Sequence, residues 1–480
     1  MTELQKIPTE DISLYEAQKK IYPREVKGRY QRIRFWVIAS VWVAFYGLAW
    51  VTWDGRQAVL FDLPARQFHI FGLTFWPQDF YLLTWLLVIG ALSLFLVTAV
   101  AGRVWCGYTC PQTVWTEAFL FMERLTEGSH RKRIKLDNGP WTFEKIWRKT
   151  AKQVLWITFA LWTGFTFVGY FTPIRELAVG VMDFDLGTWE WFWFLFYSFA
   201  TYGNAGFLRE QVCQYMCPYA RFQGAMLDRK TVTVSYDAMR GEPRRGTSAA
   251  DATGDCINCT LCVQVCPTGI DIRDGSQYEC IGCTACIDAC DDVMDKMNKP
   301  RGLVGYASFD QLAVPLEDRP HINAAENNGF FKKSFWSLIL RPRILLYIGL
   351  WTVLAGSFIL FISLRSAVAF DIIRDRNAFF QIAKTGYVDN VYTLKIMNKQ
   401  QRPLAVDLSL EEYPDAELIF KKEDLEHLPA NQMTDLPVRV RLPDAKSTGK
   451  PEKIHFVITN LETGKEIDER TLFWRPRPSN

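Results

Sequence analysis

Five stretches of the chain contain no charged residue and are each long enough to cross a bilayer as a helix. They are Phe35–Trp53, Phe80–Gly102, Gln153–Ile174, Trp191–Leu208 and Ile344–Leu364. One such run could be a buried helix of a large soluble core, but five runs with basic flanks favour a membrane protein. We therefore predict five transmembrane helices, of which Trp191–Leu208 is the shortest and the most aromatic.

The connecting segments alternate between many and few basic residues. Segments 1–34 and 103–152 contain eight and ten Lys and Arg residues, whereas segments 54–79 and 175–190 contain two and one. Cytoplasmic loops carry the excess of Lys and Arg in membrane proteins. The N-terminus and segment 209–343 are therefore predicted in the cytoplasm of a bacterial cell, and the C-terminal region in the periplasm.

The C-terminal region changes to short, alternating apolar and polar positions. Its clearest example, Val438-Arg439-Val440-Arg441-Leu442, has the period of two of a half-buried strand. Six such runs are separated by turn residues: Tyr387–Met397, Ala405–Leu410, Leu418–Phe420, Val438–Leu442, Lys453–Ile458 and Thr471–Trp474. Six or seven strands in about 100 residues predict an Ig-like β-sandwich. No cysteine or metal-ligand cluster is evident there, so we expect a partner-binding or stabilising module.

Outside the C-terminal region, a further strand is predicted at Thr231–Tyr236.

Composition and charge narrow the classes of function. The chain has 480 residues, 15% aromatic residues and a formal net charge of +3, which gives no indication of nucleic-acid binding. The basic run Arg131-Lys132-Arg133 is predicted to be a solvated patch facing lipid. No glycine motif for nucleotides is present, and the histidines are scattered outside the interior of the predicted spans, which disfavours membrane haem. The histidines are His69, His130, His321, His427 and His455.

Two cysteine runs, beginning at Cys256 and Cys280, share the spacing C-x2-C-x2-C-x3-C. This is the bacterial ferredoxin pattern for two [4Fe–4S] clusters, in which the fourth cysteine of each run reaches the other cluster. The first cluster set is therefore assigned to Cys256, Cys259, Cys262 and Cys290, and the second cluster set to Cys280, Cys283, Cys286 and Cys266. Four disulfides or two structural zinc sites are the alternatives, but zinc sites usually have two separated cysteine pairs.

A second repeat places a C-x3-C-P motif after the second and after the fourth predicted span. The two motifs are Cys106-Gly-Tyr-Thr-Cys110-Pro111 and Cys213-Gln-Tyr-Met-Cys217-Pro218. Cysteines four residues apart on a helix share a face, and the proline indicates a turn or a new helix at the second cysteine. These four cysteines, called here the boundary thiols, suit Cu(I), zinc or another thiophilic ion, with Met216 or Met122 nearby. The alternative is that they are small apolar residues of membrane helices.

All twelve cysteines fall on the predicted cytoplasmic side or at its membrane boundary, where a reducing environment keeps thiolates available as ligands. The predicted chain has five parts: a cytoplasmic arm, a four-helix membrane domain, a cytoplasmic ferredoxin-like α+β domain, a fifth transmembrane helix and a periplasmic Ig-like domain. Their boundaries are 1–34, 35–208, 209–343, 344–364 and 365–480.

The chain resembles the CcoG/FixG family of membrane-bound cytochrome oxidase accessory proteins over nearly its whole length. The similar residues are Ile21-Tyr22-Pro23-Arg24 with Lys27-Gly28-Arg29, the segment Gly102–Thr113, both ferredoxin runs and the terminal β-domain. Asp291 follows Cys290 where most bacterial ferredoxins have proline, and this aspartate is usual in the family. The resemblance implies a cupric reductase that makes Cu(I) in the cytoplasm for the copper site of a cbb(3)-type cytochrome oxidase.

The resemblance also implies roles and partners. A cytoplasmic donor would reduce the clusters, and copper would be reduced at the boundary thiols Cys106, Cys110, Cys213 and Cys217. Membrane lipid, copper-handling proteins and oxidase assembly proteins are the expected partners, with homo-oligomer formation left open and no nucleic acid. Two alternatives remain: a polyferredoxin that carries electrons to quinol or a periplasmic reductase, and a non-enzymatic scaffold for oxidase assembly.

The alternation of basic residues gives a test of topology. A reporter fused after residue 300 should be active only in the cytoplasm, and one fused after residue 480 only outside it. A C-terminal fusion active in the cytoplasm would mean that one span is miscounted, with Trp191–Leu208 the first suspect.

Overall fold

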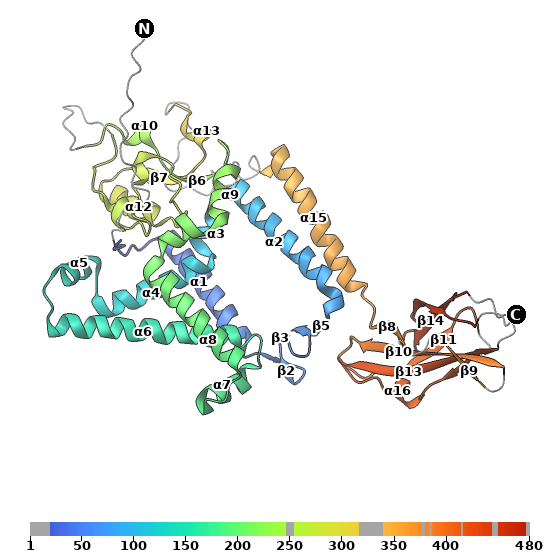
Figure 1. Cartoon of the computed structure of the whole chain (residues 1–480). Helices are drawn as coiled ribbons and strands as arrows, with labels where there is room; N and C mark the ends of the chain where they lie inside the picture. Colours follow the sequence, from blue (N-terminus) through green and yellow to red (C-terminus); the bar gives the residue numbers. More distant parts are fainter. Residues whose placement is uncertain are drawn as a thin grey trace, which may run out of the picture. The chain divides into compact units, whose positions relative to one another are not determined.

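The structure is a computed structural model of the chain, and it describes residues 20–245, 254–315, 339–375, 380–383, 386–413, 416–443 and 450–476. The chain forms two compact units, whose elements Figure 1 labels. The first unit comprises Met1–Ala44, Gly90–Phe165 and Phe192–Trp351, and the second comprises Phe45–Ile89, Thr166–Trp191 and Thr352–Asn480. Every boundary between the units falls inside one of five long helices, so each of these helices contributes residues to both units.

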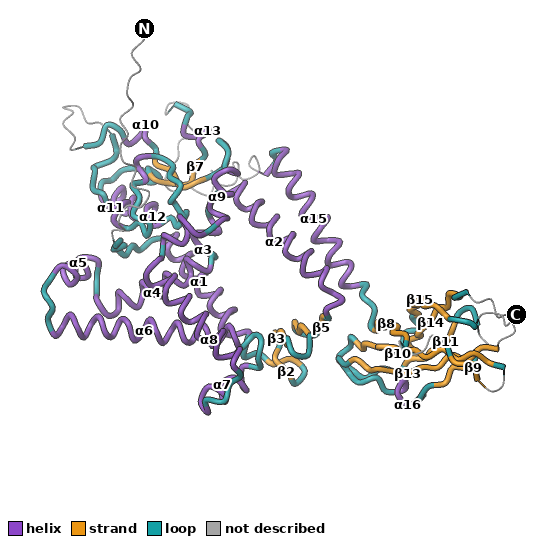
Figure 2. Tube along the Cα trace, viewed as in Figure 1, coloured by secondary structure: helices purple, strands orange, loops and turns teal. Residues whose placement is uncertain are grey.

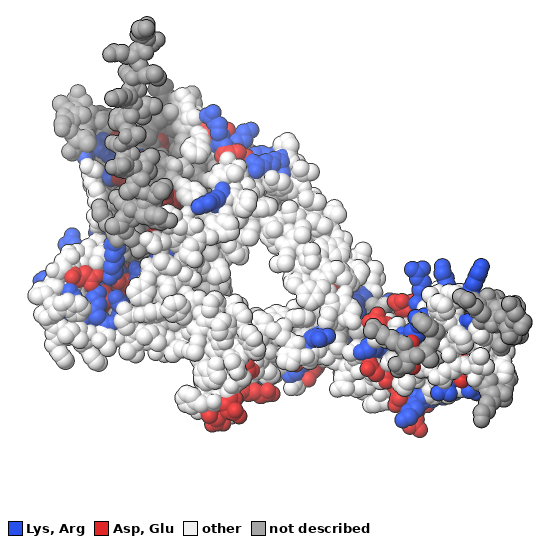
Figure 3. Space-filling model, viewed as in Figure 1, with Lys and Arg blue, Asp and Glu red and all other residues white. Residues whose placement is uncertain are grey.

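These five helices coincide with the five predicted spans. They are α1 (Arg29–Leu48), α2 (Phe80–Ala101), α6 (Phe143–Val168), α8 (Thr188–Thr201) with the π-helix Tyr202–Leu208 that continues it, and α15 (Pro342–Ser363). Among the described residues, Pro77–Ala101 and Pro342–Ser363 are long and apolar enough to cross a membrane by length and composition. In Figure 3 the surfaces of α2 and α15 are almost free of charged side chains. Two helices therefore meet the length and composition criteria for a membrane span, and the prediction of five spans stays a prediction.

Two predicted helix ends are wrong. The helix at Phe35–Trp53 begins earlier, at Arg29, and ends at Leu48, because residues 52–53 form strand β1 (Thr52–Trp53). The run Gln153–Ile174 ends as a helix at Val168, and a turn separates it from α7 (Ile174–Asp183). Hydropathy located the apolar part of each helix, but it could not show that the arginines before Phe35 also belong to α1.

The remainder of the first unit consists of short elements around the cysteines. The helices are α3 (Val104–Tyr108), α4 (Pro111–Glu127), α5 (His130–Asn138), the π-helix Val212–Met216, α9 (Pro218–Met226), α10 (Ala238–Gly241), α11 (Leu261–Gln264), the 3₁₀ turn Ile272–Asp274, α12 (Ala285–Lys296) and α13 (Phe309–Leu312). The predicted strand is confirmed as β6 (Thr233–Tyr236). It pairs antiparallel with β7 (Val304–Ala307), a strand that the sequence did not indicate.

The prediction of a solvated patch at Arg131-Lys132-Arg133 is wrong for its last residue. Arg131 and Lys132 are exposed, but Arg133 is fully buried. Its guanidinium lies 3.5 Å from the buried carboxylate of Glu123 and donates a 2.7 Å hydrogen bond to the carbonyl of Pro23. A buried cation requires partners of this kind, since removing them would leave an uncompensated charge.

The second unit begins with two small antiparallel sheets. One pairs β1 with β2 (Arg56–Gln57), and the other has the order β3 (Val59–Asp62), β4 (Gln67–Ile70), β5 (Leu73–Phe75). A 3₁₀ turn at Pro77–Asp79 then leads into α2. Strands β2 to β5 lie in the segment with few basic residues, for which the sequence predicted no structure, whereas β1 replaces the end of the first predicted span.

The C-terminal region is a pair of antiparallel sheets, as predicted, and Figure 2 shows most of the strands gathered there. One sheet has the order β12-β13-β10-β8 with β9 beside β10, and the other has the order β11-β14-β15. The bounds are β8 (Val368–Arg374), β9 (Gln381–Ala383), β10 (Tyr387–Asn398), β11 (Val406–Leu410), β12 (Glu417–Ile419), α16 (Glu423–Glu426), β13 (Met433–Pro443), β14 (Glu452–Asn460) and β15 (Glu466–Phe473). All six predicted strands are present, and β8 and β9 are additional.

Alternation in β13 builds the core between the sheets. Val438, Val440 and Leu442 are buried, whereas Arg439 and Arg441 face away from the core. The apolar side chains of both sheets form one buried cluster. This is the period-two pattern that predicted the sandwich.

The loop before α2 is joined to the β-domain by buried polar groups. Asp79, only 6% exposed, forms ion pairs with Arg365 and with Lys399, the latter at 3.5 Å. Thr74 Oγ1 donates a 2.8 Å hydrogen bond to Asn431 Oδ1. The partners come from segments about 300 residues apart, so these bonds tie the loop to the domain.

His69 gives this loop a dependence on pH. Its ring is buried, and Nδ1 lies 3.1 Å from Thr74 Oγ1. Burial, with help from the charge of Arg56 and against that of Asp62, lowers the pKa of His69 to about 4. Between pH 4 and 6.5 the unfolded loop binds a proton that the folded loop does not, so stability should rise with pH across this window and stay constant above it.

Hydrogen exchange in β3–β5, corrected for intrinsic rates, should therefore be faster at pH 5 than at pH 7.5. The opening free energy should differ by up to about 2 kcal/mol between these two pH values. His69→Asn places an amide near the position of Nδ1 and cannot titrate, so it should remove most of the difference. Equal protection at both pH values in the natural protein would contradict the assignment of a buried neutral imidazole.

Candidate metal centres

Both cysteine runs have the same backbone conformation on either side of their second cysteine. Asn258 and Thr260 flank that cysteine in the first run and have φ values of 54° and 55°. Gly282 and Thr284 flank it in the second run and have φ values of 67° and 65°. Threonine is rare in this left-handed region because its branched Cβ crowds the backbone. The repeat seen in the sequence is thus also a repeat of backbone conformation.

The two cluster sets line two cavities. The first cavity is lined by Cys256, Cys259, Cys262 and Cys290, and the second by Cys266, Cys280, Cys283 and Cys286 together with Cys262. Each run therefore places its fourth cysteine in the cavity of the other run, as cross-ligation requires. Because Cys262 lines both cavities, the two are adjacent.

The surroundings of these thiols suit a bound metal cluster. Burial raises the pKa of Cys262 to about 11 and the pKa of Cys283 and Cys290 to about 12. Backbone N–H groups of Val263 and Ala285 point at Cys262 and Cys283 and partly oppose this rise. Buried thiols of this kind ionise when they bind metal, since the cation replaces the lost solvation. None of the twelve cysteines, all of which lie in the described ranges, is in a disulfide, so the donor sets fit [4Fe–4S] clusters.

The boundary thiols have the local structure that the prolines indicated. Cys110 and Cys217 are the residues before α4 and α9, and Pro111 and Pro218 are the first residues of those helices. A fresh helix start at the second cysteine is thereby confirmed. The second motif contains a feature that the sequence did not predict, because Val212–Met216 is a π-helix. Such wide turns occur mostly at functional sites.

The two thiol pairs converge. Burial raises the pKa of Cys213 to about 12, and the nearby charges of Cys110, Cys106 and Cys217 add to the rise. Thiols from motifs about 100 residues apart are therefore close enough to repel one another when ionised. Fully buried Gln223 lies beside them, with its Oε1 3.4 Å from the sulfur of Cys106 and its Nε2 without a hydrogen-bond partner in the described structure. Four converging thiols suit a soft metal ion.

The expected methionine ligands are not at this site. Met122 packs against the apolar cluster that contains Phe119, and it lies twelve residues along α4 from Cys110, a rise of about 18 Å. Met216 is 61% exposed. The prediction is therefore wrong for Met122, and Met216 is turned largely to the exterior.

The boundary thiols and the second cluster set meet through their backbones. A Cβ atom added to Gly107 would lie 2.6 Å from the carbonyl oxygen of Gly282 and 3.0 Å from the Cα of Cys283. Real Cβ atoms do not approach so closely, so only glycine fits. The hydroxyls of Tyr108 and Thr284 are 2.8 Å apart at the same contact. The two motifs are thus in van der Waals contact although about 175 residues separate them.

Further contacts strengthen this junction. The guanidinium of Arg103 donates a 3.3 Å hydrogen bond to the carbonyl of Cys280. Cys213 lines a small cavity with Pro267 and Ile281, which are neighbours of second-set cysteines in the sequence. The centres therefore follow one another in the order first cluster set, second cluster set, boundary thiols.

The segment Ile21-Tyr22-Pro23-Arg24 and the residues after it cover the ferredoxin part. The backbone N–H of Arg24 donates a 2.8 Å hydrogen bond to the carbonyl of Gln264. Gly28 packs directly on Asp288, since a Cβ there would lie 2.1 Å from the carboxylate carbon. The sequence singled out this segment only by resemblance, and the contacts explain why its glycine is required.

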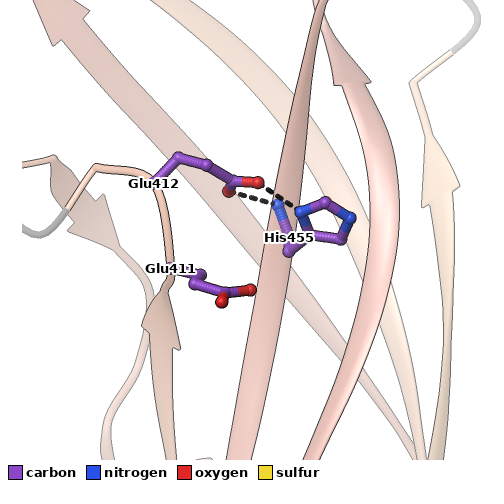
Figure 4. Close-up of side chains that lie close together, drawn as sticks. All are labelled: Glu411, Glu412 and His455. Carbon is purple, nitrogen blue, oxygen red and sulfur yellow. Dashed lines mark hydrogen bonds and ion pairs between the residues drawn. The ribbon is translucent and has the colours of Figure 1, made fainter.

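The β-domain contains one group that the sequence missed. Ligand atoms of Glu411, Glu412 and His455 lie within 4.8 Å of one another (Figure 4). Glu412 accepts hydrogen bonds from the backbone N–H of His455, at 2.8 Å, and from its ring. The expectation of no metal-ligand cluster there is therefore wrong on geometry. The residues are largely exposed, and the ion pair between Glu412 and His455 accounts for their arrangement.

Three known family models match parts of the chain. Residues 208–309 match a 4Fe-4S dicluster domain, and residues 83–126 match a 4Fe-4S binding domain. Residues 358–476 match the IG-like fold at the C-terminal of FixG. The match at 83–126 includes Cys106 and Cys110, the first pair of boundary thiols.

Relatives resemble the chain over most of its length. It is 38% identical to the nitrogen fixation protein FixG of Rhizobium meliloti, over 84% of this chain and 81% of that protein. It is 36% identical to the protein RdxB of Cereibacter sphaeroides, over 97% and 98% of the two chains. A crystal structure of a FixG-related protein from Vibrio parahaemolyticus aligns with 23% of this chain and 98% of its own, at 24% identity and a TM-score of 0.20.

Because the fourth cysteine of each run lies in the cavity of the other run, the effect of replacing it can be predicted. Cys266→Ser should damage the cluster at Cys280, Cys283 and Cys286, because Cys266 lines their cavity. Anaerobically purified protein should carry about eight iron atoms per chain and the variant about four. Iron and sulfide analysis with EPR of the reduced protein would measure this loss.

Cys290→Ser is the matched control, since it removes the fourth cysteine of the first cavity. In Cys290→Ser the EPR signal of the first cluster should disappear. The signal that Cys266→Ser loses should remain. If both variants lost the same signal, the cross-ligated assignment would be wrong.

Proposed function

This chain belongs to the FixG family of iron–sulfur proteins, and from this we propose that it is a cupric reductase of the cytoplasmic membrane. The substrate is Cu(II) and the product is Cu(I), delivered to assembly of the copper site of a cbb(3)-type cytochrome oxidase. The observation that supports the proposal is the backbone contact between the boundary thiols and the second cluster set. It brings the thiols proposed to hold copper next to the thiols proposed to hold a [4Fe–4S] cluster.

Each group of cysteines has a separate task in this proposal. The two cluster sets hold [4Fe–4S] clusters, which when bound supply the single electrons that convert Cu(II) to Cu(I) and are replenished by a one-electron donor of the cytoplasm. The boundary thiols hold copper, and their sulfur ligands favour the Cu(I) product over Cu(II). Gln223 and the buried surroundings keep water from the thiols.

The remaining parts supply location and partners. Five transmembrane helices would place the boundary thiols at the cytoplasmic surface of the membrane, with lipid around the spans. The Ig-like β-domain, on the opposite side, would bind copper-handling or oxidase assembly proteins. A homo-oligomer stays compatible with this arrangement.

A second candidate is a polyferredoxin that carries electrons to quinol or a periplasmic reductase. The match of residues 83–126 to a 4Fe-4S binding domain favours it, because Cys106 and Cys110 would then hold iron instead of copper. A scaffold without redox chemistry is the third alternative, and it requires the β-domain but neither cluster. Iron content separates the first two, since iron at the boundary thiols would raise it above about eight atoms per chain.

The copper proposal predicts the effect of removing one thiol from each pair. In Cys110→Ser/Cys217→Ser, Cu(I) production should fall more than about tenfold, since even outer-shell changes at metal sites cost about 10–100-fold. Copper binding should fall with it, because the hydroxyl of serine is a hard ligand for Cu(I). The assay is anaerobic reduction of Cu(II) by dithionite-reduced protein, followed with a chromogenic Cu(I) chelator.

Iron content and a neighbouring substitution serve as controls. Iron should stay at the natural level, and Met216→Ser, which changes an exposed side chain next to Cys217, should reduce copper normally. Loss of iron together with copper would support iron at the boundary thiols. Unchanged Cu(I) production in the double variant would contradict the proposed site.

A further inference from the structure

A buried arginine connects the first helix to the junction between the two metal centres. Arg34, on α1, is 5% exposed. Its Nε donates a 3.0 Å hydrogen bond to the carbonyl of Gly107, the residue that abuts Gly282 and Cys283. The guanidinium is therefore held on the backbone of the first boundary motif, on the side of the second cluster set.

The charge of Arg34 is only partly neutralised by its partner. Its Nη1 lies 3.1 Å from Glu117 Oε2, and the same carboxylate lies 3.0 Å from Arg124 through Oε1. These two arginines hold the pKa of Glu117 below its ordinary value despite burial, so Glu117 is an anion. Two cations share one anion, which leaves a net positive charge beside the second cluster set.

This charge acts on the second cluster set. Arg34 is hydrogen-bonded to Gly107, whose Cα packs directly against the backbone of Gly282 and Cys283. A cation at this position favours any additional negative charge bound at the second cavity. A reduced [4Fe–4S] cluster carries one more negative charge than the oxidised form, and net charge is one of the factors that set cluster potentials.

We propose that Arg34 and Glu117 are positioning residues that set the reduction potential at the second cluster set and hold the boundary thiols against it. Arg34 raises this potential, and Glu117 limits the rise. The bond to Gly107 keeps the contact with Gly282 closed, so electron transfer to the boundary thiols crosses a short distance. The inference rests on the cluster part of the proposed function and not on copper.

The first cluster set offers a matched arginine–carboxylate pair. Arg273 is bound to Asp271, with Nη2 2.6 Å from Oδ2, and it lines the first cavity together with the cysteines of the first cluster set. Substitution of Arg273 should therefore affect the other cluster. Each cluster set thus has its own charged pair for comparison.

The test is a redox titration of the full-length protein followed by EPR, without copper. Arg34→Gln should lower the midpoint potential of one [4Fe–4S] signal and leave the other unchanged, and Glu117→Gln should raise that same potential. Arg273→Gln should lower only the other signal. Arg34→Lys keeps the charge but loses the planar guanidinium, so it should hold the potential near the natural value.

Several outcomes would overturn the inference. They are an unchanged potential in iron-replete Arg34→Gln, equal shifts of both signals, or shifts of the same sign in Arg34→Gln and Glu117→Gln. If Arg34→Gln lost iron, Glu117→Gln would carry the test, and an unchanged potential there would overturn the inference. Failure of copper reduction in the natural protein would contradict the proposed function without moving these potentials, so the two failures are distinguishable.

Discussion

The arrangement of the first unit depends on one backbone contact, where Gly107 meets the peptide between Gly282 and Cys283. No side chain larger than hydrogen fits at Gly107, so the two metal-binding segments approach as closely as backbones can. Arg34 and Arg103 stabilise this contact by donating hydrogen bonds to the carbonyls of Gly107 and Cys280. The order of the three thiol groups follows from this contact.

Burial makes these thiols difficult to ionise unless a metal is bound. Their raised pKa values mean that apolar surroundings resist ionisation, and bound metal supplies the compensating charge. The N-terminal segment around Arg24 and Gly28 contributes to this burial by packing on the ferredoxin part. Helix α1, the N-terminal segment and the ferredoxin part therefore all contribute to the surroundings of these thiols, and none of them forms the site alone.

Basic residues serve two different purposes in this chain. Exposed ones such as Arg131 and Lys132 contribute to the bias that predicts topology. Buried ones such as Arg34 and Arg133 are bound to carboxylates and also to backbone carbonyls that lie 73 and 110 residues away in the sequence. A count of Lys and Arg treats both kinds alike. The count predicts orientation because the two kinds lie in the same segments, but it predicted the wrong surroundings for Arg133.

The sequence by itself determined what depends on neighbouring residues. Apolar runs gave the five long helices, alternation around Val438 gave the β-sandwich strands, and cysteine spacing gave two cluster sets, because helix, strand and cluster loop are local repeats. The tertiary structure alone decided the convergence of the boundary thiols, the burial of Arg34 and the grouping of Glu411 with His455. These depend on contacts between residues about 40 to 110 positions apart, which no local period records, since they form only when separate elements pack.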